Sequence, residues 1–263
     1  MPQLAVRKPR TVNVTRYVTP LREGGSLPAI VEADDDGLYV LKFRGAGQGP
    51  RALIAELVSG ELARACGLPV PEIVFAQLHP DLARTEPDPE IHALILDSEG
   101  LNLALDYLPG SVTFDPLVHA VDADLASRIV WFDGYVTNVD RTARNTNMLM
   151  WHRRLWLIDH GATLYAHHAP EWQSGGARAK DRFAMIESHV LRSRATAVAA
   201  VDPFLAAAID TEVISAIVEW IPESWLVAGD PGQDVAAMRA RYVQYLHDRL
   251  AEPRAFVEAV RAD

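Results

Sequence analysis

The chain has 263 residues, 49% of them hydrophobic and 23% charged, and a formal net charge of −10, which suits one large globular domain or two small lobes. The acidic balance disfavours a nucleic-acid partner, because nucleic-acid-binding proteins usually present a basic face. No apolar run reaches the ~18 residues of a membrane span, the first residues lack the apolar core of a signal peptide, and Cys66 is the single cysteine, so we expect a cytoplasmic protein without a membrane partner.

Residues 1–108 predict strands and one helix. Apolar residues recur on one face of 50–66, and Gly67 follows this segment where a glycine commonly ends a helix. The segment 80–90 is polar and contains prolines, so we expect it at the surface. Short apolar or alternating runs predict strands at 11–18, 29–33, 38–43, 73–78, 93–96 and 101–107.

After Gly110 the pattern changes. Residues 123–136 predict a helix, and a hairpin with strands at 148–151 and 155–158 follows it. From residue 181 onward the sequence predicts helices, with breaks at Pro203, Pro222, 229–232 and Pro253. We therefore predict an α+β protein with two lobes: an antiparallel sheet with one helix over 1–108, and a mainly helical lobe over 109–263.

Three oxygen-bearing side chains stand in order between Tyr135 and Gly161. Asn145 comes five residues after Asp140, and Asp159 follows the second strand of the predicted hairpin, just before His160 and Gly161. Carboxylate and carboxamide oxygens are ligands that Mg²⁺ takes when phosphates and water complete its shell. Each residue alone is typical of a polar turn or a helix cap, but the ordered set favours a metal–phosphate site.

Protein kinases carry the same order: a catalytic-loop aspartate, an asparagine five residues later, and the aspartate of Asp-Phe-Gly. Here Asn138 and Val139 replace the His-Arg before the first aspartate, and His160 replaces the phenylalanine.

Asn147 is an alternative to Asn145 as the metal ligand. A zinc site is disfavoured by the spacing of His160, His167 and His168, which we interpret as exposed loop residues or substrate-side polar groups.

The N-terminal part offers groups that could hold nucleotide phosphates. Lys42 stands near the end of an apolar strand, and Glu56, fourteen residues later in the predicted helix, is its expected ion-pair partner. Glu61 is the alternative partner, but it would point elsewhere on a helix of 3.6 residues per turn. Gly24, Gly25 and Ser26 form a turn before the strands that lead to Lys42, in the position of a glycine-rich loop.

The end of the strand-rich part could face the adenine of a nucleotide. In a kinase, backbone N–H and C=O groups contact the base at this connection between lobes, which corresponds here to Asp106, Tyr107 and Leu108. Pro109 and Gly110 then allow the chain to cross into the second part. On its own this segment is equally typical of a strand end followed by a turn.

Taken together, these segments resemble the HipA-like kinase family over about residues 10–165. The resemblance rests on the sequences Leu-Lys-Phe at 41–43, Ala-Cys-Gly-Leu-Pro-Val-Pro at 65–71, the linker 106–110, Val-Asp-Arg-Thr-Ala-Arg-Asn at 139–145 and Ile-Asp-His-Gly at 158–161. It implies a protein-kinase-like fold that uses ATP and Mg²⁺. It also implies Asp140 as catalytic base, Asn145 and Asp159 as metal ligands, and Lys42 on the phosphates.

Characterised members of that family phosphorylate serine or threonine in proteins, so the acceptor is expected to be such a hydroxyl or that of a small molecule. Ser26 is an autophosphorylation candidate by the same resemblance. One alternative is a catalytically inactive, kinase-like nucleotide-binding or scaffold protein, although Lys42, Glu56, Asp140, Asn145 and Asp159 are all present. A metal-dependent phosphohydrolase is a third hypothesis, but it would leave Lys42 and Glu56 without a role.

Overall fold

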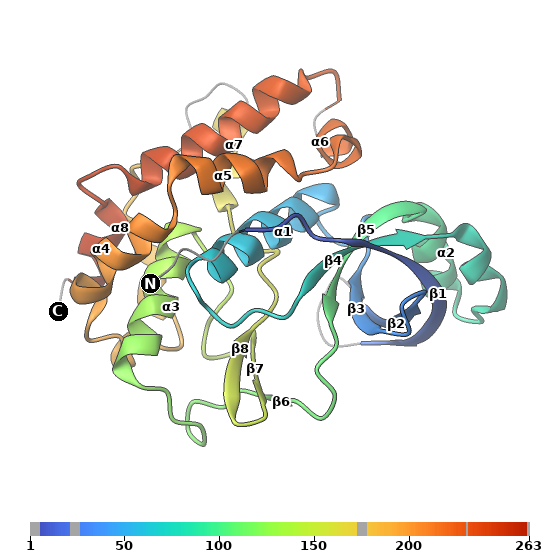
Figure 1. The fold of residues 1–263 in the computed structure, drawn as a ribbon, viewed down its shortest axis with the longest axis horizontal. Coiled ribbons are helices and arrows are strands. Elements are labelled where there is room, and N and C mark those ends of the chain that lie inside the picture. Colours follow the sequence, from blue (N-terminus) through green and yellow to red (C-terminus); the bar gives the residue numbers. More distant parts are fainter. Residues whose placement is uncertain (1–5, 22–26, 173–177, 230, 262–263) are drawn as a thin grey trace.

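The computed structural model describes residues 6–21, 27–172, 178–229 and 231–261. A small β-barrel lies beside a larger helical body, and a second, three-stranded sheet lies at one edge of that body (Figure 1). This arrangement confirms the predicted mixed α+β class. None of the helices within the described ranges combines the length and the apolar character needed to cross a bilayer.

The barrel closes in the order β1-β2-β3-β5-β4. Its strands are β1 (Thr11–Pro20), β2 (Ala29–Ala33), β3 (Leu38–Lys42), β4 (Ile73–Leu78) and β5 (Gly100–Asp106). Four pairs are antiparallel, but β1 and β4 are parallel, with Thr11 opposite Phe75. The prediction of an antiparallel sheet is therefore wrong at this pair, because strand directions cannot alternate all the way around a ring of five strands.

Strands β4 and β5 form a wall between two hydrophobic cores. Val74, Ala76 and Ala104 belong to the barrel core, whereas the alternate residues Phe75 and Leu103 belong to the core of the helical body. Successive side chains of a strand point to opposite faces, so both faces of these two strands are buried. This double burial explains why their sequences read as nearly continuous apolar runs.

A second helix, α2 (Pro89–Asp97), stands where the sequence predicts a strand at 93–96. Asp88 accepts a hydrogen bond from the Glu90 N–H at 3.0 Å, and a proline in the first turn suits a helix start. Ile91 and Ile95, one turn apart, bury into the barrel core. The strand prediction, and with it the prediction of one helix in this part, is wrong because a short apolar run fits either structure.

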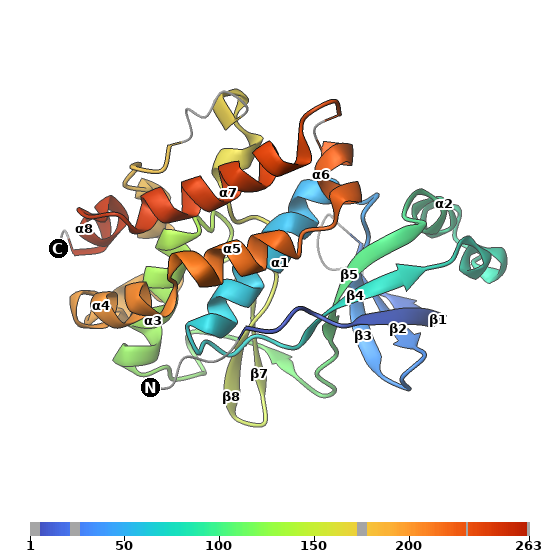
Figure 2. The same ribbon diagram turned by 45° about the horizontal axis from the view of Figure 1, so that its top comes forward.

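Helix α1 (Pro50–Ala65) confirms the predicted helix and packs mainly against α5 and α6 of the helical body, while also touching β4 and β5 (Figure 2). Its residues from Leu53 to Ala63 are all buried. The helix ends at Ala65, and Gly67 follows with a φ of 72°, the left-handed conformation that favours glycine. Because neighbours enclose it on several sides, α1 carries its polar residues into the interior.

The helical body contains a three-stranded antiparallel sheet and six α-helices in the described residues. The sheet has the order β6-β7-β8, with β6 (Val112–Thr113), β7 (Met148–Trp151) and β8 (Arg154–Leu157). The predicted hairpin is confirmed, but its second strand begins one residue earlier than predicted. The reason is that His152 and Arg153 form a tight turn, with φ of 47° and 63°. The helices are α3 (Ala123–Tyr135), α4 (Val198–Ala208), α5 (Thr211–Glu219), α6 (Glu223–Gly229), α7 (Val235–Leu250) and α8 (Ala255–Arg261).

Two details of the C-terminal part differ from the prediction. The chain before α4 forms short 3-10 helices, η4 (Ala184–Ser188) and η5 (Arg192–Arg194), as it does after the second sheet at η2 (Tyr165–His168) and η3 (Pro170–Trp172). Pro203 lies inside α4 instead of ending it. Pro203 is exposed, while Val201 and Leu205 bury the opposite side of the helix.

Buried Glu61 in α1 gives the fold a pH dependence. Burial raises its pKa from 4.5 to about 7, and Arg64 at 3.5 Å opposes this effect. The folded chain holds this proton more tightly than the unfolded chain, so the free energy of unfolding falls as pH rises from about 4.5 to about 7. We expect Glu61→Gln to stabilise the protein at pH 8 by up to about 3 kcal/mol and to change little at pH 5.

Urea unfolding at the two pH values measures this effect, with Glu258→Gln on the exposed side of α8 as the matched control. The control should leave the unfolding free energy unchanged at both pH values. An equal effect of Glu61→Gln at pH 5 and pH 8 would contradict the assignment.

Candidate functional site

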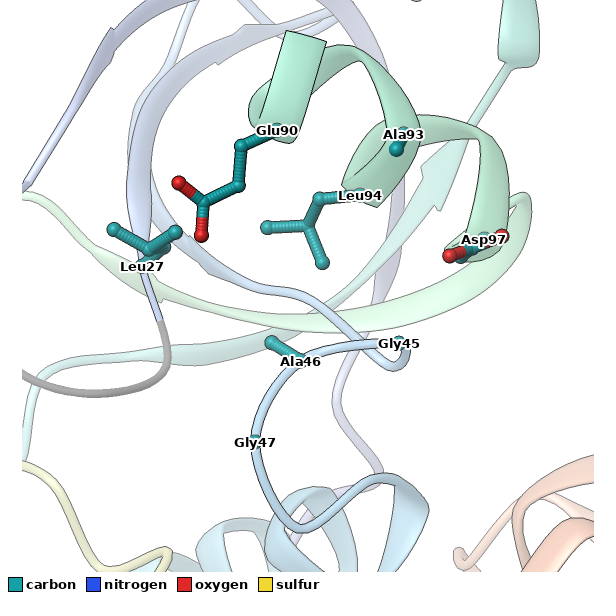
Figure 3. A pocket seen from close by; sticks show the side chains of 8 residues that line it. All are labelled: Leu27, Gly45, Ala46, Gly47, Glu90, Ala93, Leu94 and Asp97. Atoms are coloured by element: carbon teal, nitrogen blue, oxygen red, sulfur yellow. The ribbon is translucent and has the colours of Figure 1, made fainter.

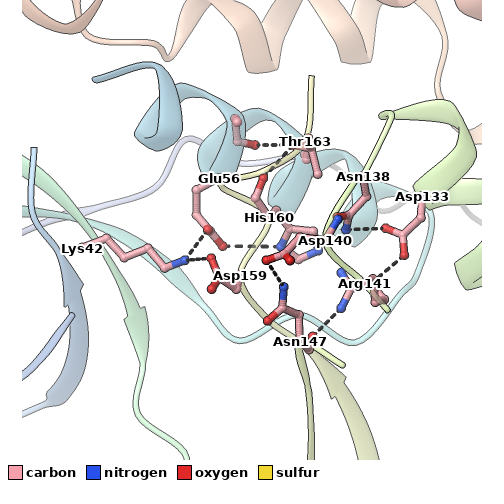
Figure 4. Close-up of polar contacts among 12 residues, drawn as sticks. Lys42, Glu56, Asp133, Asn138, Asp140, Arg141, Asn147, Asp159, His160 and Thr163 are labelled. Atoms are coloured by element: carbon pink, nitrogen blue, oxygen red, sulfur yellow. Dashed lines mark hydrogen bonds and ion pairs between the residues drawn. The ribbon is translucent and has the colours of Figure 1, made fainter. Parts of the chain in front are cut away.

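Lys42, at the end of β3, joins two carboxylates from distant parts of the chain (Figure 4). Its Nζ donates to Glu56 Oε2 of α1 at 2.6 Å and to Asp159 Oδ1, just after β8, at 2.5 Å. Lys42 is 14% exposed, and Glu56 is fully buried. The alternative partner, Glu61, instead lies near Arg64.

Lys42 and Glu56 hold each other in the ionised state. Burial alone would raise the pKa of Glu56, but the Lys42 ammonium outweighs burial and lowers this pKa. Burial alone would lower the pKa of Lys42, but Glu56 and Asp159 outweigh burial and raise it. A cation is thus fixed between a buried carboxylate and one that reaches solvent, since Asp159 is 46% exposed.

The backbone at Asp159 is held in an uncommon conformation. Its φ is 56°, in the left-handed region that costs a non-glycine residue about 1 kcal/mol or more. The nearby Gly161 is not in the left-handed region. The turn is secured from α1, because Thr163 Oγ1 lies 2.7 Å from the His160 carbonyl and 2.6 Å from Ser59 Oγ.

Asp140 lies in the loop between α3 and β7, and both candidate asparagines contact it. The side-chain amide of Asn145 donates to Asp140 Oδ2 at 2.7 Å, and that of Asn147 donates to the same oxygen at 3.1 Å. Asn145 is exposed, whereas Asn147 is buried with a φ of 47°. Of the two carboxamides, only that of Asn145 reaches solvent, which makes it the better candidate ligand.

A buried cluster beneath this loop escaped the sequence analysis. Arg141 is 1% exposed and donates to Asp133 Oδ2 at 2.6 Å. His189 also contacts this carboxylate. The available signal was Asp133 itself, a carboxylate that directly follows the apolar run Ile129–Phe132 of α3.

The structure does not leave His160, His167 and His168 all exposed. His160 and His167 are fully buried, so the interpretation as exposed loop residues is wrong for both. His160 Nδ1 lies 3.4 Å from Glu56 Oε1, and its ring meets Phe132 edge-on. No group of three or more His, Cys, Asp or Glu side chains able to hold a metal is found in the part of the chain that the structure describes.

The segment predicted to face adenine follows directly from the barrel. Asp106 ends β5 opposite Tyr39, three positions from the pair of Lys42 with Leu103, which is about 10 Å along the ladder. The Tyr107 N–H donates to the Leu38 carbonyl at 3.0 Å. Among the described residues the next N–H, that of Leu108, has no backbone partner.

The predicted glycine-rich loop, Gly24, Gly25 and Ser26, lies outside the described residues. Its flanks are described: the Leu21 N–H donates to the Pro28 carbonyl at 2.7 Å, and Ala29 pairs with Leu41. The β1–β2 connection therefore starts and ends at the Lys42 end of β3.

Two hollows lie outside this set of residues. One of about 290 Å³, between α2 and the loop after β3, is lined by Leu27, Gly45, Ala46, Gly47, Glu90, Ala93, Leu94 and Asp97 (Figure 3). The other, of about 590 Å³, lies between the end of α1 and the β7–β8 hairpin. Neither is lined by Lys42, Asp140 or Asp159.

Comparison with known proteins assigns the family. The sequence model described as HipA-like kinase matches residues 14–256, which is most of the chain. The chain belongs to the HipA-like kinase family. This membership confirms the resemblance seen in the sequence and makes the chain a kinase by class.

One solved structure agrees with this family at the level of the fold. The crystal structure of a Helicobacter pylori proinflammatory kinase, CtkA, covers 96% of this HipA-like kinase and 99% of its own chain, with a TM-score of 0.59 and 13% identity. The Golgi casein kinase with Mn/ADP bound gives a TM-score of 0.44 at 12% identity, covering 95% and 74%. No curated protein matched the sequence.

Proposed function

We propose that this HipA-like kinase transfers the terminal phosphoryl group of ATP, with Mg²⁺, to a hydroxyl group. The acceptor is a serine or threonine of a protein, or a small-molecule alcohol. The observation that carries the proposal is the joining of Lys42, Glu56 and Asp159 by ion pairs of 2.5 and 2.6 Å. An ion pair that only stabilises the fold needs no third charged group that reaches solvent. A site that binds both phosphate and a metal ion does need such a group.

The side chains present fit a magnesium ion. Asn145 and Asp159 offer a carboxamide and a carboxylate oxygen, both from groups that reach solvent. Mg²⁺ commonly takes only one or two protein ligands and completes its shell with phosphates and water. When bound, the ion neutralises the charge that develops on the phosphates during transfer.

The remaining nucleotide contacts come from the barrel. Lys42 binds the phosphates as a fixed cation, held in place by Glu56. The backbone of the loop containing Gly24, Gly25 and Ser26 would cover them, and the peptide groups of Asp106, Tyr107 and Leu108 would meet the adenine edge. Positioning and electrostatics of this kind supply most of the catalysis in phosphoryl transfer.

Asp140 acts on the acceptor. Its carboxylate orients the acceptor hydroxyl and takes its proton as the oxygen bonds to the γ-phosphorus. The bond from that phosphorus to the bridging β–γ oxygen breaks, and ADP carries away the electron pair. Asn145 and Asn147 hold the carboxylate by its Oδ2, which keeps Oδ1 available for the acceptor.

The proposal includes a two-lobed kinase layout, with residues 1–108 as the ATP-binding lobe and residues 109–263 as the helical lobe. The separate barrel core supports this division. Helix α1 belongs to the first lobe by sequence, yet it is buried in the second core. It therefore connects Lys42 rigidly to the helical body through Glu56.

The direct test is ADP formation from ATP, together with transfer of label from γ-labelled ATP to the chain itself or to a generic protein acceptor such as casein. We expect Mg²⁺-dependent ADP formation that EDTA abolishes. ATP binding without any turnover would instead favour the catalytically inactive, nucleotide-binding alternative.

A further inference from the structure

A buried carboxylate lies directly beneath the candidate catalytic loop. Asp133, in the last turn of α3, is fully buried among apolar neighbours such as Val130 and Phe132. Burying a charge is costly unless it is paired, and a negative charge at the carboxyl end of a helix opposes the helix dipole. The stability of α3 therefore does not account for this carboxylate.

Every hydrogen-bond partner that the structure gives to this carboxylate belongs to the loop or to the segment docked on it. Arg141 Nε donates to Oδ2 at 2.6 Å, and Asn138 Nδ2 donates to Oδ1 at 3.0 Å. His189 Nε2 donates to Oδ2 at 2.8 Å, because Nδ1 of the same ring accepts from the Leu191 N–H. Burial would raise the pKa of Asp133, but Arg141 and His189 outweigh it and hold this pKa well below its usual value.

Two routes lead from these partners to Asp140 (Figure 4). On the first, Asn138 Oδ1 accepts from the Asp140 backbone N–H at 3.1 Å. On the second, Arg141 Nη1 donates to the Asn147 carbonyl, and the Asn147 side chain donates to Asp140 Oδ2 at 3.1 Å. Both the backbone and the carboxylate of Asp140 are thus tied to one buried group.

The segment after η4 joins the same cluster. His189 forms a β-bridge with Thr142, and the Val190 N–H donates to the Arg141 carbonyl at 3.1 Å. Backbone and side-chain bonds therefore fix this segment to the residues that flank Asp140. Asp133 sits at the centre of a cluster drawn from α3, the loop and the segment 189–190.

We propose that Asp133 is a positioning residue that aims Asp140 at the acceptor hydroxyl through Asn138 and through Arg141 with Asn147. The inference rests on the proposed function and adds to it the group that holds the catalytic base in place. Asp133 has no solvent exposure, so it acts only through these partners. A displacement of about 1 Å in a catalytic group can lower a rate about 100-fold.

The test compares Asp133→Asn with Asp202→Asn. Asp202, on α4 and outside the loop, forms a mostly buried ion pair with Arg254 at 2.8 Å. ADP formation from ATP and Mg²⁺ is measured per folded molecule, with the folded fraction taken from thermal unfolding. We expect Asp133→Asn to lower kcat about 10- to 100-fold with KM for ATP within about twofold, and Asp202→Asn to leave both unchanged.

A double-mutant cycle separates positioning from general destabilisation. If Asp133 acts through Asp140, Asp133→Asn should lower kcat by less than about twofold further in the Asp140→Asn background. Equal kcat per folded molecule for Asp133→Asn and Asp202→Asn, or full additivity with Asp140→Asn, would overturn the inference alone. An Asp140→Asn variant as active as the wild type would overturn the proposed function together with it.

Asn138→Ala keeps the inference testable if Asp133→Asn does not fold. This change removes one route without leaving a buried charge unpaired. We expect kcat to fall about tenfold at unchanged KM for ATP, the size of effect that a lost positioning contact produces. An unchanged kcat in this variant would overturn the inference.

Discussion

Replacing Asp140 with asparagine should lower kcat for phosphoryl transfer by about 10²–10⁴-fold, because the amide cannot accept the proton of the acceptor hydroxyl. The affinity for ATP should stay within about twofold, since Asp140 acts on the acceptor and asparagine has nearly the same shape. Steady-state ADP formation gives kcat, and calorimetric titration with ATP gives the affinity. Asp248→Asn, an exposed carboxylate on α7, is the matched control and should behave as the wild type.

An Asp140→Asn variant that keeps the wild-type kcat would remove Asp140 from the mechanism. A loss of ATP affinity equal to the loss of kcat would place its role in nucleotide binding instead. The two measurements together therefore distinguish a base from a phosphate or metal contact.

Replacing Lys42 with methionine should destabilise the fold by about 3–5 kcal/mol at pH 8, because it leaves the buried charge of Glu56 without its main partner. The loss should shrink at low pH. In the wild type the pKa of Glu56 lies below its usual 4.5, so its contribution is present above that pH and is lost as pH falls. In the variant, burial raises this pKa, so stability falls as pH rises.

Denaturant unfolding at pH 5 and pH 8 measures this change in slope. Adding Glu56→Gln to Lys42→Met should recover most of the lost stability at pH 8, since no buried charge remains unpaired. Lys180→Met, on an exposed residue, is the control. A Lys42→Met variant with the same loss at both pH values would contradict the pairing.

The sequence predicted those parts of the site that depend on spacing along the chain. Lys42 near a strand end and Glu56 in the following helix meet as expected, because the strand and the helix are both set by local patterns. Asp140 and Asn145 meet for the same reason, since Asn145 comes five positions after Asp140 in one loop. The spacing of apolar residues also predicted the helices at 50–66 and 123–136 and the hairpin before Asp159.

Features that depend on distant contacts were not predictable in this way. Closure of the barrel is decided by the pairing of β1 with β4, about sixty residues apart. Helix α2 was missed because the burial of Ile91 and Ile95 under the barrel decides its form. The role of Asp133 becomes visible only when Arg141 and His189, from two other segments, meet it in space.

The measurement that tests the central claim most directly is calorimetric ATP binding with Mg²⁺ or with EDTA, on the wild type and on Asp159→Asn. The account predicts that Mg²⁺ tightens ATP binding to the wild type by about tenfold or more, equal to about 1.4 kcal/mol. It also predicts that Asp159→Asn loses this gain while still folding. ATP binding that is absent from the wild type, or equally dependent on Mg²⁺ in both proteins, would contradict it.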